Sequence, residues 1–248
     1  SRTFLVRNYL LTSLLKSRNF PYTNSLATIK KMGLSRPINN VFLSEDFHFA
    51  EIDFGLDSFV EYLELTNTLI DNNVKKHLSE YDNTSDEAKD YFFDPSDIYI
   101  KQKSLQLYYS SIVISLYSFF EQSLLKLAEI PEKDKKIKID DISGNGIIFT
   151  IKKYLEKVIE IDFKEMNYEW NEITKLNQLR NLFVHSSNSI LKKSESKKRI
   201  NTLKNIKQLK VTEKSDYYIL EFESDELIRH FIEIIRVFLN KTYTSKCS

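Results

Sequence analysis

Three side chains suited to phosphodiester chemistry stand close together in the segment Leu179–His185: Arg180, Asn181 and His185. A guanidinium stays charged, grips phosphate oxygens in pairs and can neutralise charge that builds on phosphorus. An imidazole titrates near neutral pH and can take up or deliver a proton. These groups could cleave RNA without a metal, by transferring the phosphate onto the neighbouring 2′-hydroxyl.

Each residue has an expected role in such a reaction. His185 takes the proton of the attacking 2′-hydroxyl or gives one to the leaving 5′-oxygen, and Arg180 stabilises the phosphorane. Asn181 orients the imidazole or hydrogen-bonds the phosphate. The products are a 2′,3′-cyclic phosphate and a 5′-hydroxyl, and DNA is inert because it lacks the attacking group. In the structural alternative, Arg180 makes a surface ion pair and His185 caps a helix C-terminus.

A helix from about Asn167 to Ser186 must position these residues. Its expected apolar face consists of Ile173, Leu176, Leu179 and Phe183. Asn181 and His185 are four residues apart and lie in one polar row, whereas Arg180 and His185 are separated by about 140° on an ideal helix. One helix therefore directs both at one phosphate only if the Arg180 side chain reaches across or the last turn loosens. Alternatively, two copies in a symmetric dimer complete one composite cleft.

A second helix, from about residue 98 to 130, is apolar nearly all round, which predicts a central and largely buried element. One stripe of it is small and polar and would let another helix approach closely, within the chain or across a dimer: Ser104, Ser111, Ser115, Ser118 and Gln122. Glu121 lies within the apolar surface. Because an unpaired buried charge is costly, Glu121 needs a basic partner, for which Arg180 is the candidate, unless it reaches solvent at the helix rim.

The rest of the chain predicts an all-α bundle with a small β hairpin before the last helix. Residues 1–56 form an N-terminal arm of mixed helix and irregular structure, broken at Pro21, Gly33, Pro37 and Gly55. The helical domain covers residues 57–243. Its further elements are a helix that starts at Asp57 or Ser58, a helix from Ile147 to about Ile161, a hairpin of Val211 and Tyr217–Phe222 that turns around residues 214–216, and a helix from about Ser224 to Thr242.

The sequence Arg180-Asn181-Leu182-Phe183-Val184-His185 resembles the Arg-x4–6-His motif of the HEPN superfamily of helical ribonucleases and nucleotide-binding proteins. The resemblance covers this motif and the helical pattern. It implies a HEPN-like helical bundle, a homodimer that pairs two motifs, and a metal-independent endoribonuclease that acts as a toxin or phage-defence effector. It also implies an antitoxin or other regulatory protein as partner, and an acidic residue on an earlier core helix, here Glu121.

Two other functions fit the same resemblance. The chain is then a catalytically silent HEPN-like module that binds nucleotide, RNA or a partner protein, or it is a toxin whose His185 is modified by a partner enzyme. Catalysis predicts that His185→Ala removes cleavage and preserves the fold. A binding module predicts salt-sensitive RNA association without product.

Charge is distributed unevenly along the chain, although the net charge is +1. Residues 45–97 carry fifteen acids against three Lys, and residues 188–210 carry eight bases against Glu195 alone. The basic run after His185 predicts phosphate contacts. Its residues singled out for RNA binding are Lys192, Lys193, Lys197, Lys198 and Arg199. Alternatively, oppositely charged faces neutralise one another within the fold.

Composition narrows the class of protein further. A single cysteine, Cys247, excludes an internal disulfide framework and a Cys-based zinc site, and favours a reducing cytoplasm. The sequence has no run of 18 apolar residues, so no membrane span is predicted. Gly-rich phosphate loops, His-Glu-x-x-His and Gly-x-Ser-x-Gly patterns are missing from the sequence. We therefore expect neither a cofactor nor a bound metal.

Overall fold

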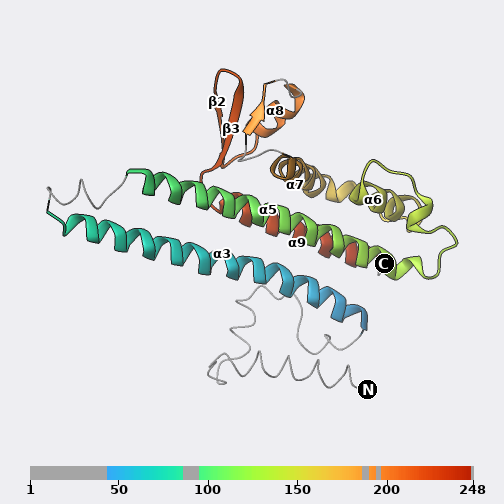
Figure 1. The fold of residues 1–248 in the computed structure, drawn as a ribbon. Coiled ribbons are helices and arrows are strands. Elements are labelled where there is room, and N and C mark those ends of the chain that lie inside the picture. Colours follow the sequence, from blue (N-terminus) through green and yellow to red (C-terminus); the bar gives the residue numbers. More distant parts are fainter. Residues whose placement is uncertain (1–43, 86–94, 186–189, 194–196, 247–248) are drawn as a thin grey trace, which may run out of the picture. The chain divides into compact units, whose positions relative to one another are not determined.

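A computed structural model describes residues 44–85, 95–185, 190–193 and 197–246 (Figure 1). The α-helices in these residues are α3 (Ser44–Asp82), α5 (Pro95–Glu132), α6 (Ile147–Lys157), α7 (Asn167–His185), α8 (Lys197–Lys204) and α9 (Glu226–Lys246). The strands are β1 (Ile190–Lys192), β2 (Leu209–Glu213) and β3 (Tyr217–Phe222). The expected mostly helical fold is confirmed, but the expected hairpin is part of a three-stranded sheet. None of the described helices has the length and hydropathy needed to cross a membrane.

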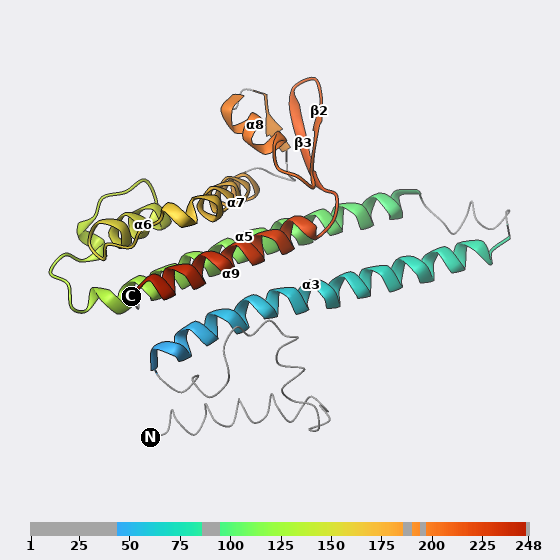
Figure 2. The same ribbon diagram turned by 180° about the vertical axis from the view of Figure 1, so that it is seen from behind.

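Helix α5 is the centre of the helical unit, which comprises the chain from His48 onward. It contacts α6, α7 and α9, and the two views agree that α9 runs beside it (Figures 1 and 2). Its fully or nearly buried side chains include Ile112, Val113, Leu116, Phe120, Leu124, Leu127 and Ala128. The expected central helix is therefore confirmed. Its stripe of small polar residues is exposed, so that the described helices of the same chain leave it uncovered.

The helix expected to begin at Asp57 begins thirteen residues earlier, at Ser44. The side chains that extend its buried face toward the N-terminus are Phe49, Ile52 and Leu56. Gly55, expected to interrupt the chain, lies inside this helix, and a Cβ there would collide with the Phe119 ring of α5. The penalty of a helical glycine, about 1 kcal/mol, is offset by this close approach. The rest of the expected arm, residues 1–43, lies outside the described residues.

Asp57 is not a helix cap; it belongs to a partly buried ion-pair group that joins α3 to α9. The Arg236 Nη2 group of α9 donates to Asp57 Oδ1 over 2.7 Å, and Nη1 of the same guanidinium donates to Asp53. The side chains of Arg236 and Asp53 are 18% and 6% exposed. Burial disfavours charge here, so it raises the pKa of Asp57 and lowers the pKa of Arg236. Their mutual attraction must offset this desolvation.

The sheet is antiparallel, with strand order β1-β3-β2. Its β2–β3 hairpin turns at residues 214–216, which confirms the expected hairpin. Strand β1 and helix α8 were not expected, since the sequence indicated only a basic segment there. Apolar residues that are hidden in that segment form part of the core: Leu191, Ile200, Leu203 and Ile206.

Phe222, the last residue of β3, fixes the sheet to the helices. The Gln106 carboxamide of α5 accepts from the Phe222 N–H over 2.7 Å and donates to the Phe222 carbonyl over 3.0 Å. The Phe222 ring lies 5.6 Å from the Tyr109 ring of α5 and 5.5 Å from the Phe183 ring of α7, measured between centroids. The root of the hairpin is therefore held by two helices at once.

Helices α7 and α9 are joined by charged groups at their contact. Glu172 accepts from Lys175 over 2.5 Å and lies 3.2 Å from the His230 ring nitrogen of α9. Burial alone raises the pKa of the Glu172 carboxyl, but the hydrogen bonds from Lys175 and His230 outweigh it and hold that pKa below its ordinary value. The ionised form of Glu172 is thus stabilised by folding.

The free energy of unfolding should therefore depend on pH through Glu172. A carboxyl whose pKa is depressed in the folded state stabilises it above the unfolded pKa, about 4.3, and this contribution disappears as pH falls through the folded value. Glu172→Gln should cost about 1 kcal/mol at pH 7 and flatten the acid limb of stability. Urea unfolding between pH 7 and 3 measures both effects, and Glu129→Gln, at an exposed position of α5, is the control. Parallel pH profiles for parent and Glu172→Gln would contradict this assignment.

Candidate functional site

The second half of α7 carries the candidate site. Its buried residues, which face α5 and α9, are Ile173, Leu176, Leu179 and Leu182, close to the expected apolar face. Phe183, expected on that face, is partly buried and contacts Phe222. This packing leaves Arg180 and Asn181 at the edge of the buried face, each partly buried. The helix ends at His185, one residue from the expected end.

The Arg180 guanidinium is fixed by two neighbours that carry no negative charge. Its Nη1 group donates to Asn181 Oδ1 over 2.8 Å, and its central carbon lies 5.1 Å from the centroid of the Tyr117 ring of α5. Its Nε atom is buried and has no hydrogen-bond partner among the described residues. Within the described chain, Arg180 forms no ion pair with a carboxylate, so its charge remains available to an anion.

Tyr117 connects Arg180 to Glu121. The Tyr117 side chain is buried, and burial raises the pKa of its phenol to about 12, helped by the negative charge of Glu121 and opposed by the positive charge of Arg180. Both charged groups are therefore close enough to act on this phenol. The direct Glu121–Arg180 ion pair expected from the sequence is not formed in the described structure. Glu121 is partly exposed, which is closer to the expected alternative of a carboxylate at the helix rim.

Asn181 is occupied within its own helix. Its Oδ1 atom accepts from Arg180, and its Nδ2 group donates to Asn177 Oδ1 over 3.1 Å. The side chain that was expected to orient His185 thus connects Asn177 to Arg180 instead. Because Asn181 is engaged on both sides, it limits the rotation of the guanidinium.

His185 is separate from this cluster. It is the last residue of α7 and is exposed. The helix runs regularly through it, so five residues separate it from Arg180 by about 140° around the axis and about 7.5 Å along it. The loosened last turn that would let one protomer direct both side chains at one phosphate is not formed. The structure brings together Arg180, Asn181, Tyr117 and Glu121, and leaves His185 at the end of the same helix.

The basic segment after His185 is divided between two surfaces. Lys192, in β1, is exposed, whereas the neighbouring Lys193 pairs with Glu213 of β2 over 2.8 Å. Hydrogen bonding to Glu213 raises the pKa of the Lys193 ammonium. The side chains of Lys197, Lys198 and Arg199, at the start of α8, lie outside the described residues. Of the five residues expected to bind RNA, Lys193 is thus already paired.

Tyr117 is the site residue that the sequence did not single out. It belongs to the helix that was expected to be apolar nearly all round, and it is buried there. The available signal was its spacing: Tyr117 precedes Glu121 by four residues, which places both on one side of a helix. A buried tyrosine one turn from a carboxylate is a candidate support for a cation from a neighbouring helix.

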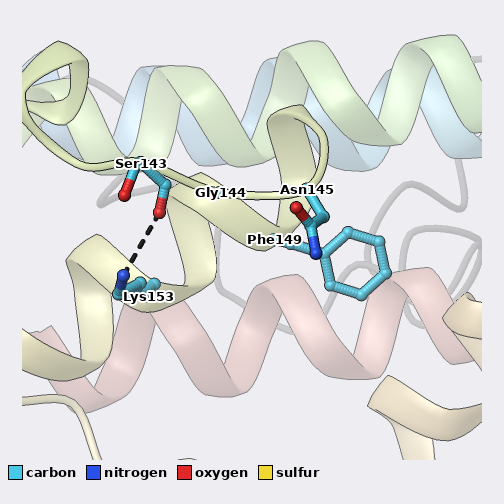
Figure 3. A pocket seen from close by; sticks show the side chains of 5 residues that line it. All are labelled: Ser143, Gly144, Asn145, Phe149 and Lys153. Atoms are coloured by element: carbon cyan, nitrogen blue, oxygen red, sulfur yellow. Dashed lines mark hydrogen bonds between the residues drawn. The ribbon is translucent and has the colours of Figure 1, made fainter.

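A separate hollow of about 590 Å³ lies where the chain enters α6. Its lining residues are Ser143, Gly144, Asn145, Phe149 and Lys153 (Figure 3). The Lys153 ammonium is the charged group of this lining, and it donates to the Ser143 carbonyl over 3.2 Å. Among the described residues, no carboxylate or histidine lines the hollow, and its one ammonium already donates to a backbone carbonyl.

Comparisons with protein-family models, curated proteins and solved structures find no significant match. In the described ranges, no group of three or more His, Cys, Asp or Glu side chains is arranged to hold a metal ion.

Proposed function

We propose that this chain is a HEPN-like, metal-independent endoribonuclease that works as a homodimer in the cytoplasm. One observation carries the proposal: the Arg180 guanidinium is fixed by Asn181 and Tyr117, makes no ion pair with a described carboxylate, and belongs to the helix that ends in His185. An immobilised arginine without a carboxylate partner suits a phosphoryl oxygen that gains charge in the transition state. The mutually contacting helices α5, α7 and α9 agree with a HEPN-like bundle.

In the proposed reaction the RNA 2′-oxygen attacks the adjacent phosphorus, and the bond from phosphorus to the 5′-oxygen breaks. One histidine removes the 2′-hydroxyl proton or protonates the departing 5′-oxygen, with water or a second histidine completing the proton transfer. Arg180 stabilises the charged phosphorane. The products are a 2′,3′-cyclic phosphate and a 5′-hydroxyl, so that atoms and protons balance.

A second copy of the chain accounts for the separation of Arg180 from His185. In a two-fold dimer, His185 of one protomer would meet Arg180 of its partner, and two equivalent sites would form. The exposed stripe of α5 that includes Ser111, Ser115 and Ser118 lies on the same helix as Tyr117 and Glu121 and offers a surface for close helix approach. By resemblance, a toxin or phage-defence role with a restraining antitoxin belongs to the same proposal.

A catalytically silent module is the second candidate. The observation that favours it is the engagement of Asn181 with Arg180 and Asn177, which leaves His185 without its expected orienting partner in one chain. Such a module would use Arg180 to bind a phosphate and would not break the bond. RNA association that weakens steeply with salt is common to both candidates.

The deciding experiment is incubation of the purified chain with tRNA and total RNA in EDTA, followed by analysis of the product ends. We expect cleavage with 2′,3′-cyclic phosphate and 5′-hydroxyl ends, and none on DNA of matched sequence or on RNA with a 2′-deoxy sugar at the cleavage site. Cleavage that requires added Mg²⁺, or that proceeds on DNA, would overturn the mechanism. RNA that is bound but intact would favour the silent module.

Tyr117 should contribute to the same activity through its ring. Tyr117→Leu removes the π face beneath Arg180 and should slow cleavage by about 5-fold to 30-fold, the equivalent of about 1 to 2 kcal/mol for a partly desolvated cation–π contact. Tyr117→Phe keeps the ring and should stay within about twofold of the parent. Initial rates on a defined RNA, with circular dichroism to verify folding, distinguish the two variants. Equal rates for Leu and Phe would mean that the ring does not position Arg180.

A further inference from the structure

The two faces of the small sheet differ in what covers them. One face carries Leu191, Leu220 and Phe222, which are buried. Helix α8 packs on this side: its Lys204 ammonium lies 4.9 Å from the Tyr218 ring centroid, and its residue Leu203 is buried. Since successive residues of a strand point to opposite faces, Tyr217 and Ile219 belong to the other side.

The other side, called here the outer face, is formed by seven residues from all three strands, Glu221 among them. The strand register places Ile190 opposite Ile219 and Lys192 opposite Tyr217 on one side, and Thr212 opposite Ile219 on the other. Lys210 lies opposite Glu221. Ile190, Lys192 and Lys210 are exposed, and Thr212, Tyr217 and Ile219 are partly exposed.

The two neighbouring tyrosines of β3 differ in their surroundings. The Tyr218 ring has two ammonium groups near it, those of Lys193 at 5.7 Å and Lys204 at 4.9 Å from its centroid. The Tyr217 ring, on the outer face, contacts no other ring or cation among the described residues. An aromatic ring that is partly exposed and unoccupied offers a stacking surface for a base.

The lysines show the same contrast between faces. Lys193 and Lys204 both pair with Glu213, over 2.8 and 3.8 Å. Lys192 and Lys210 have no carboxylate partner in the part of the chain that the structure describes, even though Glu221 is directly opposite Lys210 in the register. Lys192 is opposite Tyr217 of β3, and Lys210 is opposite Glu221 of β3. Because these two β3 residues are four positions apart, the two ammonium groups lie at opposite ends of the outer face, roughly 13 Å apart along the strand.

We propose that the outer face is a binding surface for single-stranded RNA, with a base stacked on Tyr217 and backbone phosphates on Lys192 and Lys210. This inference rests on the proposed function and identifies the substrate as unpaired RNA. Ile190 and Ile219 supply apolar contact beside the stacked base. Lysines that form no ion pair favour a polyanion over a neutral protein surface, and stacking on an open ring requires bases that are not paired.

The position of this surface suits the candidate site. Ile190 follows His185 by five residues, so their Cα atoms are at most about 18 Å apart. The Phe183–Phe222 ring contact joins the last turns of α7 to the same sheet. An RNA strand on the outer face therefore needs few nucleotides to bring its phosphate to the end of α7.

Binding of a fluorescent oligouridine of about 12 nucleotides, in the usual size range for one domain, tests the proposal directly. The 248-residue chain is used with His185→Ala, so that cleavage does not interfere. Tyr217→Ser should weaken binding by about 10-fold to 100-fold, and Tyr217→Phe should restore it. Lys192→Gln should weaken binding and lower the slope of log affinity against log salt by about 0.7, whereas Lys193→Gln should change affinity little.

The outcomes separate this inference from the ribonuclease proposal. If Tyr217→Ser and Lys192→Gln bind the oligonucleotide as the His185→Ala parent does, the outer face is not the RNA surface, even when the wild-type chain cleaves RNA. If the parent binds no RNA and the wild type cleaves none, both proposals fail. A Tyr217→Ser variant that keeps RNA affinity but changes self-association in sedimentation would assign the face to protein contact and overturn the inference.

Discussion

His185→Ala should reduce RNA cleavage by about 100-fold to 10,000-fold, the contribution of a general acid or base. The residue is exposed at the end of α7, so its removal should change the free energy of unfolding by no more than about 0.5 kcal/mol. Initial cleavage rates, oligonucleotide affinity and urea unfolding measure the three quantities on one protein. His230→Ala is the matched control. It removes the α9 histidine that is hydrogen-bonded to Glu172 of α7, and it should keep cleavage. Undiminished cleavage by His185→Ala would remove this residue from the mechanism.

Mixing two inactive variants tests whether the site is shared between protomers. His185→Ala and Arg180→Ala should each be inactive alone. If His185 of one protomer acts with Arg180 of the other, an equal mixture gives half mixed dimers, each with one intact site, and about a quarter of the parent activity returns. If no activity returns, although subunit exchange has been confirmed, both residues of each site lie in one chain. That result would contradict the composite cleft.

The double change Asp53→Ala/Asp57→Ala should lower the free energy of unfolding by about 3 to 5 kcal/mol, because it leaves Arg236 charged and largely buried. The carboxylate that remains nearby is Glu233, 3.7 Å away and 66% exposed, and a solvated pair of this kind gives little compensation. Urea unfolding followed by circular dichroism gives the change in the free energy of unfolding. The slope of that free energy against urea concentration must be the same for parent and variant.

Two controls make this result specific. Glu51→Ala removes a more exposed carboxylate from the same helix, 3.7 Å from Lys126, and should cost less than about 1 kcal/mol. Adding Arg236→Met to the double change should recover part of the loss, since the uncompensated charge is then gone. A double variant no less stable than Glu51→Ala would mean that Arg236 is adequately solvated.

The long helices could be predicted because their apolar residues repeat at helical spacing over many turns. Helix α5 and the helix that carries Arg180 were expected within a few residues of their observed bounds. The start of α3 was missed since Gly55 was taken as a break, and its role depends on the approach of Phe119, which is a tertiary contact. Strand β1 was missed because it has only three residues and lies in a basic segment. Three residues are too few to show the apolar repeat of a helix or of a strand.

The candidate site was predictable in its residue types but not in its contacts. Helical spacing placed Asn181 and Arg180 on the correct helix. It did not indicate that Tyr117 would take the place of Glu121 as the neighbour of Arg180, because such a contact depends on the rotation of two helices about their axes and on side-chain reach. Likewise, the difference between Lys192 and Lys193 could not be anticipated, since it exists only once β1 pairs with β3.

The double hydrogen bond between Gln106 and Phe222 anchors one end of the hairpin to α5. Its root is fixed to α5 by the backbone and to α7 by the Phe222 ring, and its tip is the turn at residues 214–216. The turn is held as well, because the Lys193 N–H at the end of β1 donates to the Asp216 carbonyl over 3.0 Å. A change at Gln106 would therefore release the root of the hairpin from α5 while β1 still holds its turn.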